Sequence, residues 1–196
     1  TANSDVSSGS GNITIDANTG NFNMFAGSTV ITTLNDITIS ADTASLAGQI
    51  QTTTATGDIT IAADTAATAI NLGVGAAAGL ALTDAELNTL EANNVRIGTV
   101  AGAPYAGATT GAITFVGAFA ADAAFATDVF ELRTTGAVAD SANVLDFSTS
   151  TSDVVVRAGT TVDLDTAAHD FNTVSISAGT TVTLNDTNGL TVGTVD

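Results

Sequence analysis

Short runs in which apolar and polar residues alternate occur throughout the chain. The clearest run spans residues 36–40, where two isoleucines are interleaved with Asp36, Thr38 and Ser40. Alternation with a period of two places the isoleucines on one face of an extended strand and the polar residues on the other. Glycine, asparagine and aspartate separate such runs, and these residues favour tight turns. The pattern predicts an all-β chain of short strands joined by turns.

These runs repeat at a nearly constant spacing. Residues 36–43 recur at 58–65 with an offset of 22, and only Ser40 is replaced, by Ala62. Near the C-terminus the sequence Ala-Gly-Thr-Thr-Val at 158–162 recurs with an offset of 20. A period of this length matches one turn of a solenoid built from short strands and is too short for a βαβ unit.

Stacking the repeats predicts ladders of equivalent residues, two facing inward and one facing outward. The inward ladders are Ile13, Ile37, Ile59 and Ile15, Ile39, Ile61, and the outward ladder is Thr14, Thr38, Thr60. With a mean period near 22, the chain corresponds to about nine coils of a parallel β-helix. We expect residues 1–11 to be a linker or a frayed start and residues 12–196 to be a single β-solenoid array.

One segment departs from the strand pattern. Thr83 followed three residues later by Glu86 forms a capping-box sequence, and Leu87 and Leu90 fall on one helical face. We therefore predict a short helical insertion over residues 83–92. The alanine-rich stretch 117–128, which has several phenylalanines in or beside it, fits neither pattern.

The composition favours a thin, regular core. Hydrophobic residues make up 44% of the chain, which argues against disorder, whereas aromatic residues make up only 5% and tryptophan is absent. We expect the core to be built from valine, isoleucine, leucine and alanine. There is no cysteine, so a disulfide framework is excluded. The longest weakly polar run, residues 73–82, is too short to cross a bilayer, and no membrane insertion is expected.

The charge is strongly acidic, with 20 acidic residues, three basic ones and a net charge of −17. Nucleic acids, anionic membranes and polyanionic substrates are disfavoured, because all are bound through lysine and arginine. We expect most acids to lie on turns and keep the protein soluble. The basic side chains are predicted to be surface groups paired with nearby acids. These are the three arginines, Arg96, Arg133 and Arg157, together with the one histidine, His169. The candidate partners are Glu131, Asp153 and Asp170.

Four aspartates are candidates for a cation site. Asp36 with Asp58, and Asp42 with Asp64, occupy equivalent repeat positions and would stack about 5 Å apart. Such a pair of carboxylates could share Ca²⁺, which takes six to eight oxygen ligands. The alternative, which we favour, is that these carboxylates accept backbone N–H groups at turns. Calcium is the only cofactor that the sequence suggests.

A polysaccharide-active enzyme is the least favoured alternative. Asp163 and Asp165 would share one strand face, as the two carboxylates of a glycosidase must face one substrate. Thr183 and Asn185 replace them one repeat later, as expected for an ordinary outward polar face. His169 is isolated in the sequence, and there is no tryptophan to stack on a sugar ring. We therefore predict a non-enzymatic protein without catalytic or cofactor-binding residues.

Residues 79–98 carry the most specific motif of the chain. Their sequence is Gly-Leu-Ala-Leu-Thr-Asp-Ala-Glu-Leu-Asn-Thr-Leu-Glu-Ala-Asn-Asn-Val-Arg-Ile-Gly. Together with the Ile-Thr-Ile runs, it resembles the repeat region of filamentous haemagglutinin-type exoproteins, which are large Gram-negative adhesins of the two-partner secretion system. The resemblance covers residues 12–115 and does not include the family's N-terminal secretion domain. It implies a right-handed parallel β-helix, passage through an outer-membrane secretion pore, and a role in adhesion, aggregation or biofilm.

We therefore expect a secreted rod segment of a large surface adhesin. Its contacts would be neighbouring repeats or subunits end to end, and receptors or glycans on host or neighbouring cells. The alternative is a subunit that self-assembles end to end into an extracellular filament or surface layer. The strand-like run 190–195 and the lack of polar caps favour such end contacts, because an uncovered sheet edge invites pairing.

Overall fold

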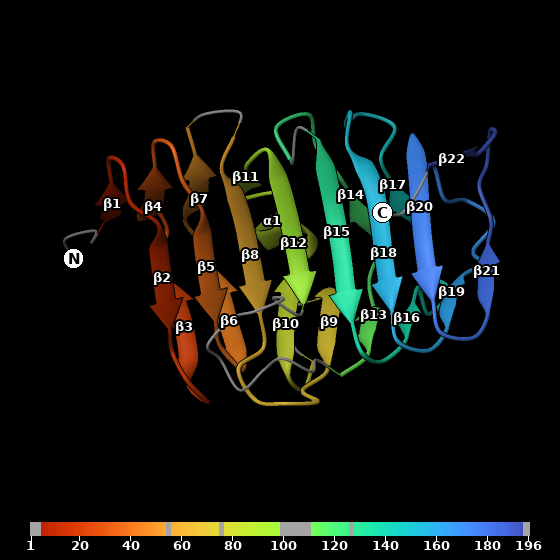
Figure 1. Cartoon of the computed structure of the whole chain (residues 1–196), viewed down its shortest axis with the longest axis horizontal. Coiled ribbons are helices and arrows are strands. Elements are labelled where there is room, and N and C mark those ends of the chain that lie inside the picture. The colour runs from red at the N-terminus through yellow and green to blue at the C-terminus, as the bar shows by residue number, and fades with distance from the viewer. Residues whose placement is uncertain (1–4, 54–55, 75–76, 99–110, 126–127, 194–196) are drawn as a thin grey trace.

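The computed structural model describes residues 5–53, 56–74, 77–98, 111–125 and 128–193. Among these residues the regular structure is nearly all β-strand, and each strand pair is parallel. The prediction of an all-β chain is confirmed. Figure 1 shows the strands lying side by side along the long axis of the molecule, from the N-terminal end to the C-terminal end.

The largest sheet stacks one strand from each successive repeat. In sheet order, its strands are β2 (Ile13–Asp16), β5 (Ile37–Ser40), β8 (Asp58–Ala62), β12 (Asn94–Gly98), β15 (Val129–Thr134), β18 (Asp153–Ala158), β20 (Thr173–Ala178) and β22 (Thr191–Val192). Neighbours in this sheet are never consecutive in sequence, because the chain visits other sheets before it returns.

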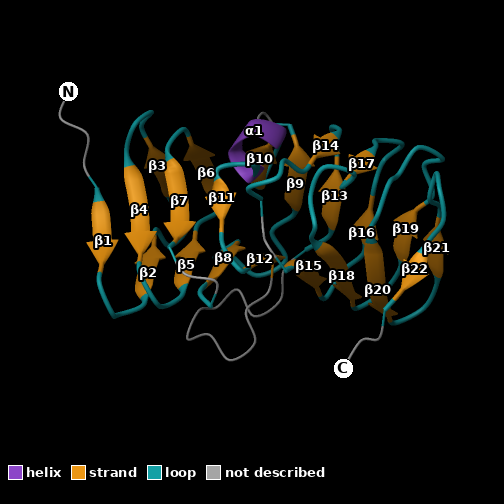
Figure 2. Ribbon diagram, turned by 90° about the horizontal axis from the view of Figure 1, so that it is seen from above, coloured by secondary structure: helices purple, strands orange, loops and turns teal. Residues whose placement is uncertain are grey.

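Four smaller sheets form the other walls, as Figure 2 shows from above. One contains β1 (Val6–Ser8), β4 (Thr29–Thr32), β7 (Gln49–Thr52) and β11 (Leu90–Glu91). The next contains β10 (Leu80–Thr83), β9 (Ile70–Gly73), β13 (Ile113–Phe115), β16 (Val138–Ala139), β19 (Val162–Leu164) and β21 (Val182–Leu184). The two pairs are β3 (Asn21–Met24) with β6 (Thr43–Leu46), and β14 (Phe119–Ala120) with β17 (Leu145–Asp146).

The predicted isoleucine ladders are present in register. Ile13 pairs with Ile37 and Ile37 with Ile59, and the second ladder runs in the same way from Ile15. All but Ile15 are buried, and Ile15 is half-buried against the core. The threonine ladder also forms, but its exposure falls along the stack until Thr60 is buried.

The C-terminal repeat is confirmed as well. Val162 of β19 pairs with Val182 of β21, and Leu164 pairs with Leu184 two residues on. Ala158 of β18 meets Ala178 of β20 in the large sheet. The 20-residue offset read from the sequence is therefore one step of the stack.

Segment 1–11, expected to be a linker or a frayed start, contains a strand. Val6–Ser8 form β1, in which Val6 pairs with Val30 of β4. Asp5 accepts the Thr29 N–H at 2.9 Å and closes the start of this ladder. Three residues are too few for an alternation of apolar and polar residues to predict a strand. The strand forms because its backbone pairs with the edge of β4.

The predicted helix is shorter than expected. Thr83 accepts the Glu86 N–H at 3.1 Å while Glu86 accepts the Thr83 N–H at 2.8 Å, so the capping box is confirmed. Helix α1 nevertheless spans only Asp84–Leu87, and Leu90 begins β11, pairing with Ile50 of β7. Leu87 and Leu90 are both buried, but strand pairing replaces the second helical turn.

Substitution of Thr83 by alanine is expected to lower the free energy of unfolding by about 1 kcal/mol, the usual cost of losing an N-cap. Urea unfolding followed by circular dichroism measures this loss. Thr19→Ala, in an exposed turn, is the matched control and should change stability by less than about 0.5 kcal/mol. Equal losses in the two variants would contradict the capping role.

One strand lies out of sequence order. β10 follows β9 in the chain but pairs with it on the side away from β13. Gly73 ends β9 with φ of +85°, and a Cβ there would lie 2.2 Å from the carbonyl oxygen of Gly117. The backbones of Gly73 and Gly117 approach so closely that only glycine fits at either position.

The core is more aromatic than the composition suggests. Six of the eight phenylalanines are among the largest fully buried side chains and form a chain of ring contacts: Phe115, Phe119, Phe125, Phe130, Phe147 and Phe171. The expectation of a purely aliphatic core is wrong for the C-terminal half of the chain, where these phenylalanines lie. Within stretch 117–128, Phe119 belongs to β14 and Phe125 packs on its ring, while residues 126–127 lie outside the described residues.

Candidate functional site

The carboxylate of Asp36 caps the start of the next strand in the large sheet, and the carboxylate of Asp58 accepts a side-chain amide. The Asp58 N–H donates to Asp36 Oδ1 at 3.0 Å, and the Asp36 N–H donates to Asn12 Oδ1 at 3.3 Å. Asn94 continues the column, because its amide donates to Asp58 Oδ1 at 2.7 Å. Each side chain thus bonds a group on the adjacent repeat, and Asn12 and Asp36 accept the backbone N–H that the turn-capping interpretation predicts.

Asp42 and Asp64 are also engaged by neighbouring side chains and backbone. Asp42 accepts the Thr65 N–H at 2.8 Å and the Thr65 hydroxyl, while Asp64 accepts the Ser40 hydroxyl at 3.4 Å. Within the ranges that the structure describes, no group of three or more His, Asp or Glu side chains is placed to hold a metal ion. Asp36 and Asp42 thus accept backbone N–H groups, as the capping interpretation predicts. Asp58 and Asp64 instead accept side-chain donors of Asn94 and Ser40.

The environment of Asp58 perturbs the pKa of its carboxyl. Burial raises the pKa of its carboxyl above the ordinary value, and the nearby charges of Asp36 and Glu131 act in the same direction. The hydrogen bond from Asn94 and the charge of Arg96 oppose the rise without cancelling it. Ionised Asp58 is therefore mildly unfavourable in the folded protein.

Substitution of Asp58 by asparagine is expected to raise the free energy of unfolding at pH 7 by up to about 0.5 kcal/mol. Asparagine keeps the Oδ1 acceptor for Asn94 and removes the charge. Because folding raises the pKa of Asp58, its ionised carboxyl lowers the stability of the wild type in full above the folded-state pKa. This loss of stability is absent below pH 3.8, where the carboxyl is protonated in the folded and the unfolded protein. Urea unfolding of the wild type and Asp58→Asn at pH 7 and at a pH below 3.8 measures the difference in stability. The exposed variant Asp163→Asn is the control. A gain that persists in acid would contradict the electrostatic explanation.

Asp163 and Asp165, the candidate glycosidase pair, lie on the outside of the molecule. Both are exposed, and Asp163 stands beside Thr183 in the register of β19 and β21. The backbone carbonyl of Asp165 accepts the Asn185 amide at 3.4 Å. These contacts are those of an outward polar face.

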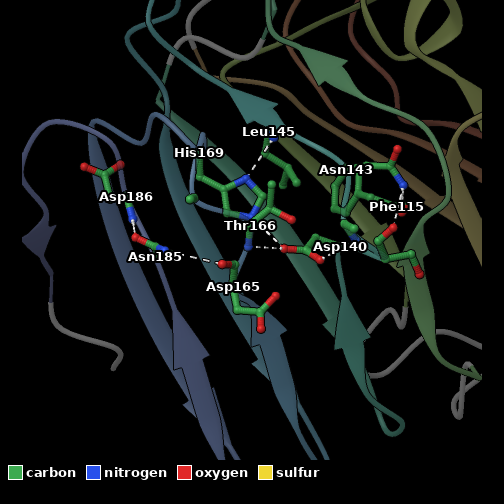
Figure 3. Close-up of polar contacts among 12 residues, drawn as sticks. Phe115, Asp140, Asn143, Leu145, Asp165, Thr166, His169, Asn185 and Asp186 are labelled. Atoms are coloured by element: carbon green, nitrogen blue, oxygen red, sulfur yellow. Dashed lines mark hydrogen bonds and ion pairs between the residues drawn. The ribbon is translucent and has the colours of Figure 1, made fainter.

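His169, predicted to be a surface group, is completely buried. Its Nδ1 accepts the Leu145 N–H at 3.0 Å, and its Nε2 lies 2.7 Å from Asp140 Oδ2 (Figure 3). Because Nδ1 is an acceptor, the proton of the neutral ring is on Nε2 and is donated to Asp140. The surface prediction is wrong because Asp140, which lies 29 residues earlier, provides a buried partner.

Asp140 is the centre of this buried network. Its Oδ1 accepts the Ala142 N–H at 2.9 Å, and its Oδ2 accepts the Thr166 N–H at 3.0 Å. Burial alone would raise the pKa of Asp140, but these N–H groups and His169 outweigh it and hold the pKa below its usual value. The Asp140–His169 pair joins adjacent repeats, because its two residues lie 29 positions apart. Both ring nitrogens of His169 are engaged in hydrogen bonds, so neither is available as a general base.

The second polar cluster lies on the outer face of the large sheet. Arg96 Nε is 2.5 Å from Glu131 Oε2, and Arg157 Nε is 3.1 Å from Glu131 Oε1. The three side chains come from β12, β15 and β18, so one glutamate bridges two arginines across three strands. The predicted pairing with Glu131 is confirmed for Arg96 and Arg157. Arg133 stands beside Arg157 in the register of β15 and β18.

Asp170, another predicted arginine partner, instead accepts the Asn188 amide at 3.1 Å. The third, Asp153, pairs with Val129 in the register of β18 and β15 and is exposed.

Comparison of the chain with protein-family models, curated proteins and solved structures finds no match. In the parts of the chain described above, no helix is long and apolar enough to span a bilayer.

Proposed function

We propose that the protein is a non-enzymatic, extracellular structural rod that forms part of a large bacterial surface adhesin. The observation that carries this proposal is the in-register stacking of whole repeats in the eight-stranded sheet. Such a stack grows along one axis and presents long, regular faces, which suits a spacer that holds a contact surface away from a cell. We propose that it is a right-handed parallel β-helix of about nine coils.

The chemistry of the polar side chains supports a scaffold. The aspartates at strand starts bond backbone N–H groups of the next repeat, and the buried Asp140–His169 pair joins adjacent repeats. The acidic surface supports solubility, because a net charge of −17 makes rods repel one another. Export through an outer-membrane pore and a role in attachment, aggregation or biofilm follow from the resemblance of residues 79–98 to haemagglutinin-type repeats.

A second candidate is a subunit that stacks end to end into a filament. Apolar side chains are exposed on or next to strands at the two ends of the stack: Val6 on β1, Phe25 directly after β3, Val182 on β21 and Val192 on β22. Covering them removes apolar surface and edge backbone from water. In the adhesin, further repeats of the same polypeptide cover them, whereas in the filament another copy does so.

A denaturing gel of the source cells and their medium, probed with an antibody against this chain, separates the two proposals. The adhesin predicts a band far above the 19.2 kDa of the chain, with its peptides identified by mass spectrometry. A band near 19.2 kDa whose protein forms fibres in native buffer would overturn the adhesin and support the filament.

A further inference from the structure

The exposed loop between β21 and β22 contains the one Asn-Gly pair of the chain, Asn188–Gly189. Both residues are exposed, and a Cβ on Gly189 would meet no heavy atom within 4 Å. The backbone nitrogen that follows an asparagine can attack the side-chain amide carbon, and glycine hinders this attack least because it has no Cβ. Every other asparagine of the chain is followed by a residue with a side chain, so the sequence singles out Asn188.

Two carboxylates bond the groups that would react. Asp186 Oδ2 accepts the Gly189 N–H at 2.9 Å and the Asn188 N–H at 3.3 Å. Asp170 Oδ1 accepts the side-chain amide of Asn188 at 3.1 Å. A general base must lie within hydrogen-bond reach of the proton that it removes, and Asp186 meets this condition for the Gly189 nitrogen.

Asp186 is also held in position by the buried side of the loop. Burial would raise the pKa of its carboxyl, but the N–H groups of Phe171, Gly189 and Asn188 outweigh burial and hold the pKa below its usual value. Its Oδ1 accepts the Phe171 N–H at 2.9 Å, while its Oδ2 bonds the loop. A carboxylate of low pKa is a weak base, so its contribution here comes from its fixed position beside the nitrogen.

We propose that Asn188 is a self-deamidation site in which Asp186 accepts the proton of the attacking nitrogen. The Gly189 nitrogen forms a bond with Cγ of Asn188 and passes its proton to Asp186. The bond from Cγ to the side-chain nitrogen breaks, and that nitrogen leaves as ammonia with the same proton. The product is a cyclic imide, which one water molecule opens at either carbonyl to give aspartate or isoaspartate. The reaction needs no oxidant or reductant, and the site does not depend on the proposed adhesive function.

The modification acts on the last rung of the stack. The Thr187 N–H donates to the His169 carbonyl at 2.8 Å, and Thr191 pairs with Thr173 of β20, so the chain is anchored on both sides of the site. Isoaspartate lengthens the backbone between these anchors by a methylene group. Either product also places a carboxylate opposite Asp170, where the wild type has an amide donor, and like charges repel. We therefore expect β22 to separate from β20 as the protein ages.

The test is incubation of the folded full chain at neutral pH, followed by peptide mass spectrometry that locates each deamidated residue. Asn188 should react before Asn185, an exposed asparagine of the same loop that is followed by Asp186. Asp186→Asn keeps an oxygen for the Phe171 N–H and should slow the reaction of Asn188 about tenfold or more, because the proton acceptor is lost. In urea the two chains should react at the same rate, since the fold no longer holds Asp186 beside the nitrogen.

Hydrogen exchange measures the consequence for β22. The Gly193 N–H donates to the Val174 carbonyl at 2.8 Å, and its exchange should become faster in aged wild type. It should stay unchanged in aged Asn188→Gln, because cyclisation from glutamine needs a larger ring.

The site is overturned if Asn185 reacts as fast as Asn188 in the folded protein. The role of Asp186 is overturned if folded Asp186→Asn reacts as fast as the wild type or faster, or if it is slower by the same factor in urea. If Asp186→Asn does not fold, Asp186→Glu, which displaces the carboxylate, gives the comparison and should also react more slowly than the wild type. Exchange of the Gly193 amide that does not change with age overturns the separation of β22 alone.

Discussion

Substitution of Phe130 by alanine is expected to lower the free energy of unfolding by about 3–5 kcal/mol, the usual cost of removing a fully buried ring. Phe130 is completely buried, and its ring centroid lies 5.1 Å from that of Phe125 and 5.7 Å from that of Phe119. It also contacts Phe147 at 5.8 Å, so its loss leaves a cavity between adjacent repeats. Urea unfolding monitored by circular dichroism measures the change.

Phe25→Ala is the matched control for this prediction. Phe25 is 76% exposed, so its truncation should change stability by less than about 0.5 kcal/mol. Similar losses for Phe130→Ala and Phe25→Ala would show that the aromatic cluster is not the core of the C-terminal half.

Substitution of Asp140 by alanine is expected to cost about 3–5 kcal/mol, because it leaves several buried donors without an acceptor. The N–H groups of Ala142 and Thr166 and the Nε2–H of His169 all lose their partner. Exposed Asp163→Ala, on neighbouring β19, should be nearly neutral. Hydrogen exchange of the Leu145 amide, which donates to His169, gives a local measure of the loss. Unchanged protection of that amide in Asp140→Ala would contradict the assigned network.

The same network predicts a loss of stability in acid. The pKa of Asp140 is lowered by folding, so its contribution is complete above the ordinary value of 3.8 and disappears as the pH falls through the lowered folded-state value. Asp186 acts in the same direction: burial would raise its pKa, but N–H groups of Phe171, Gly189 and Asn188 hold it below the usual range. The stability difference between the wild type and Asp140→Asn should therefore narrow only below pH 3.8, in unfolding curves measured stepwise from neutral pH.

The isoleucine ladders were predictable because a local pattern recurs there at intervals of 22–24 residues. The steps from Ile59 to Val95 and from Val95 to Phe130 span 36 and 35 residues and were not predictable from that interval. Once Ile37 and Ile59 are known to be equivalent, their strands can pair in register only by stacking the repeats, which buries both side chains. The capping box at Thr83 was predictable for the same reason, since all of its atoms lie within four residues. The end of α1 was not, because the backbone edge of β7 decides that Leu90 is extended.

The polar clusters depend on contacts between repeats that the sequence pattern does not encode. Asp140 and His169 occupy no repeated position, and nothing near either residue indicates a partner. Glu131 was a candidate partner for the arginines, but its bridging of Arg96 and Arg157 requires the registers of β12, β15 and β18 together. The low aromatic fraction concealed the phenylalanine cluster, because a percentage does not show that six rings meet in one place.

The in-register ladders also determine how such a sequence can change in length. Inserting one residue at the start of β8, before Ile59, would turn Ile59 and Ile61 toward solvent. It would break the pairing of Ile59 with Ile37 and Val95 on the adjacent strands. Duplicating or deleting a complete repeat of 20–24 residues leaves every ladder intact and changes only the number of rungs. Unequal recombination between the near-identical segments 36–43 and 58–65 would add or remove 22 residues, which is one complete step of the stack.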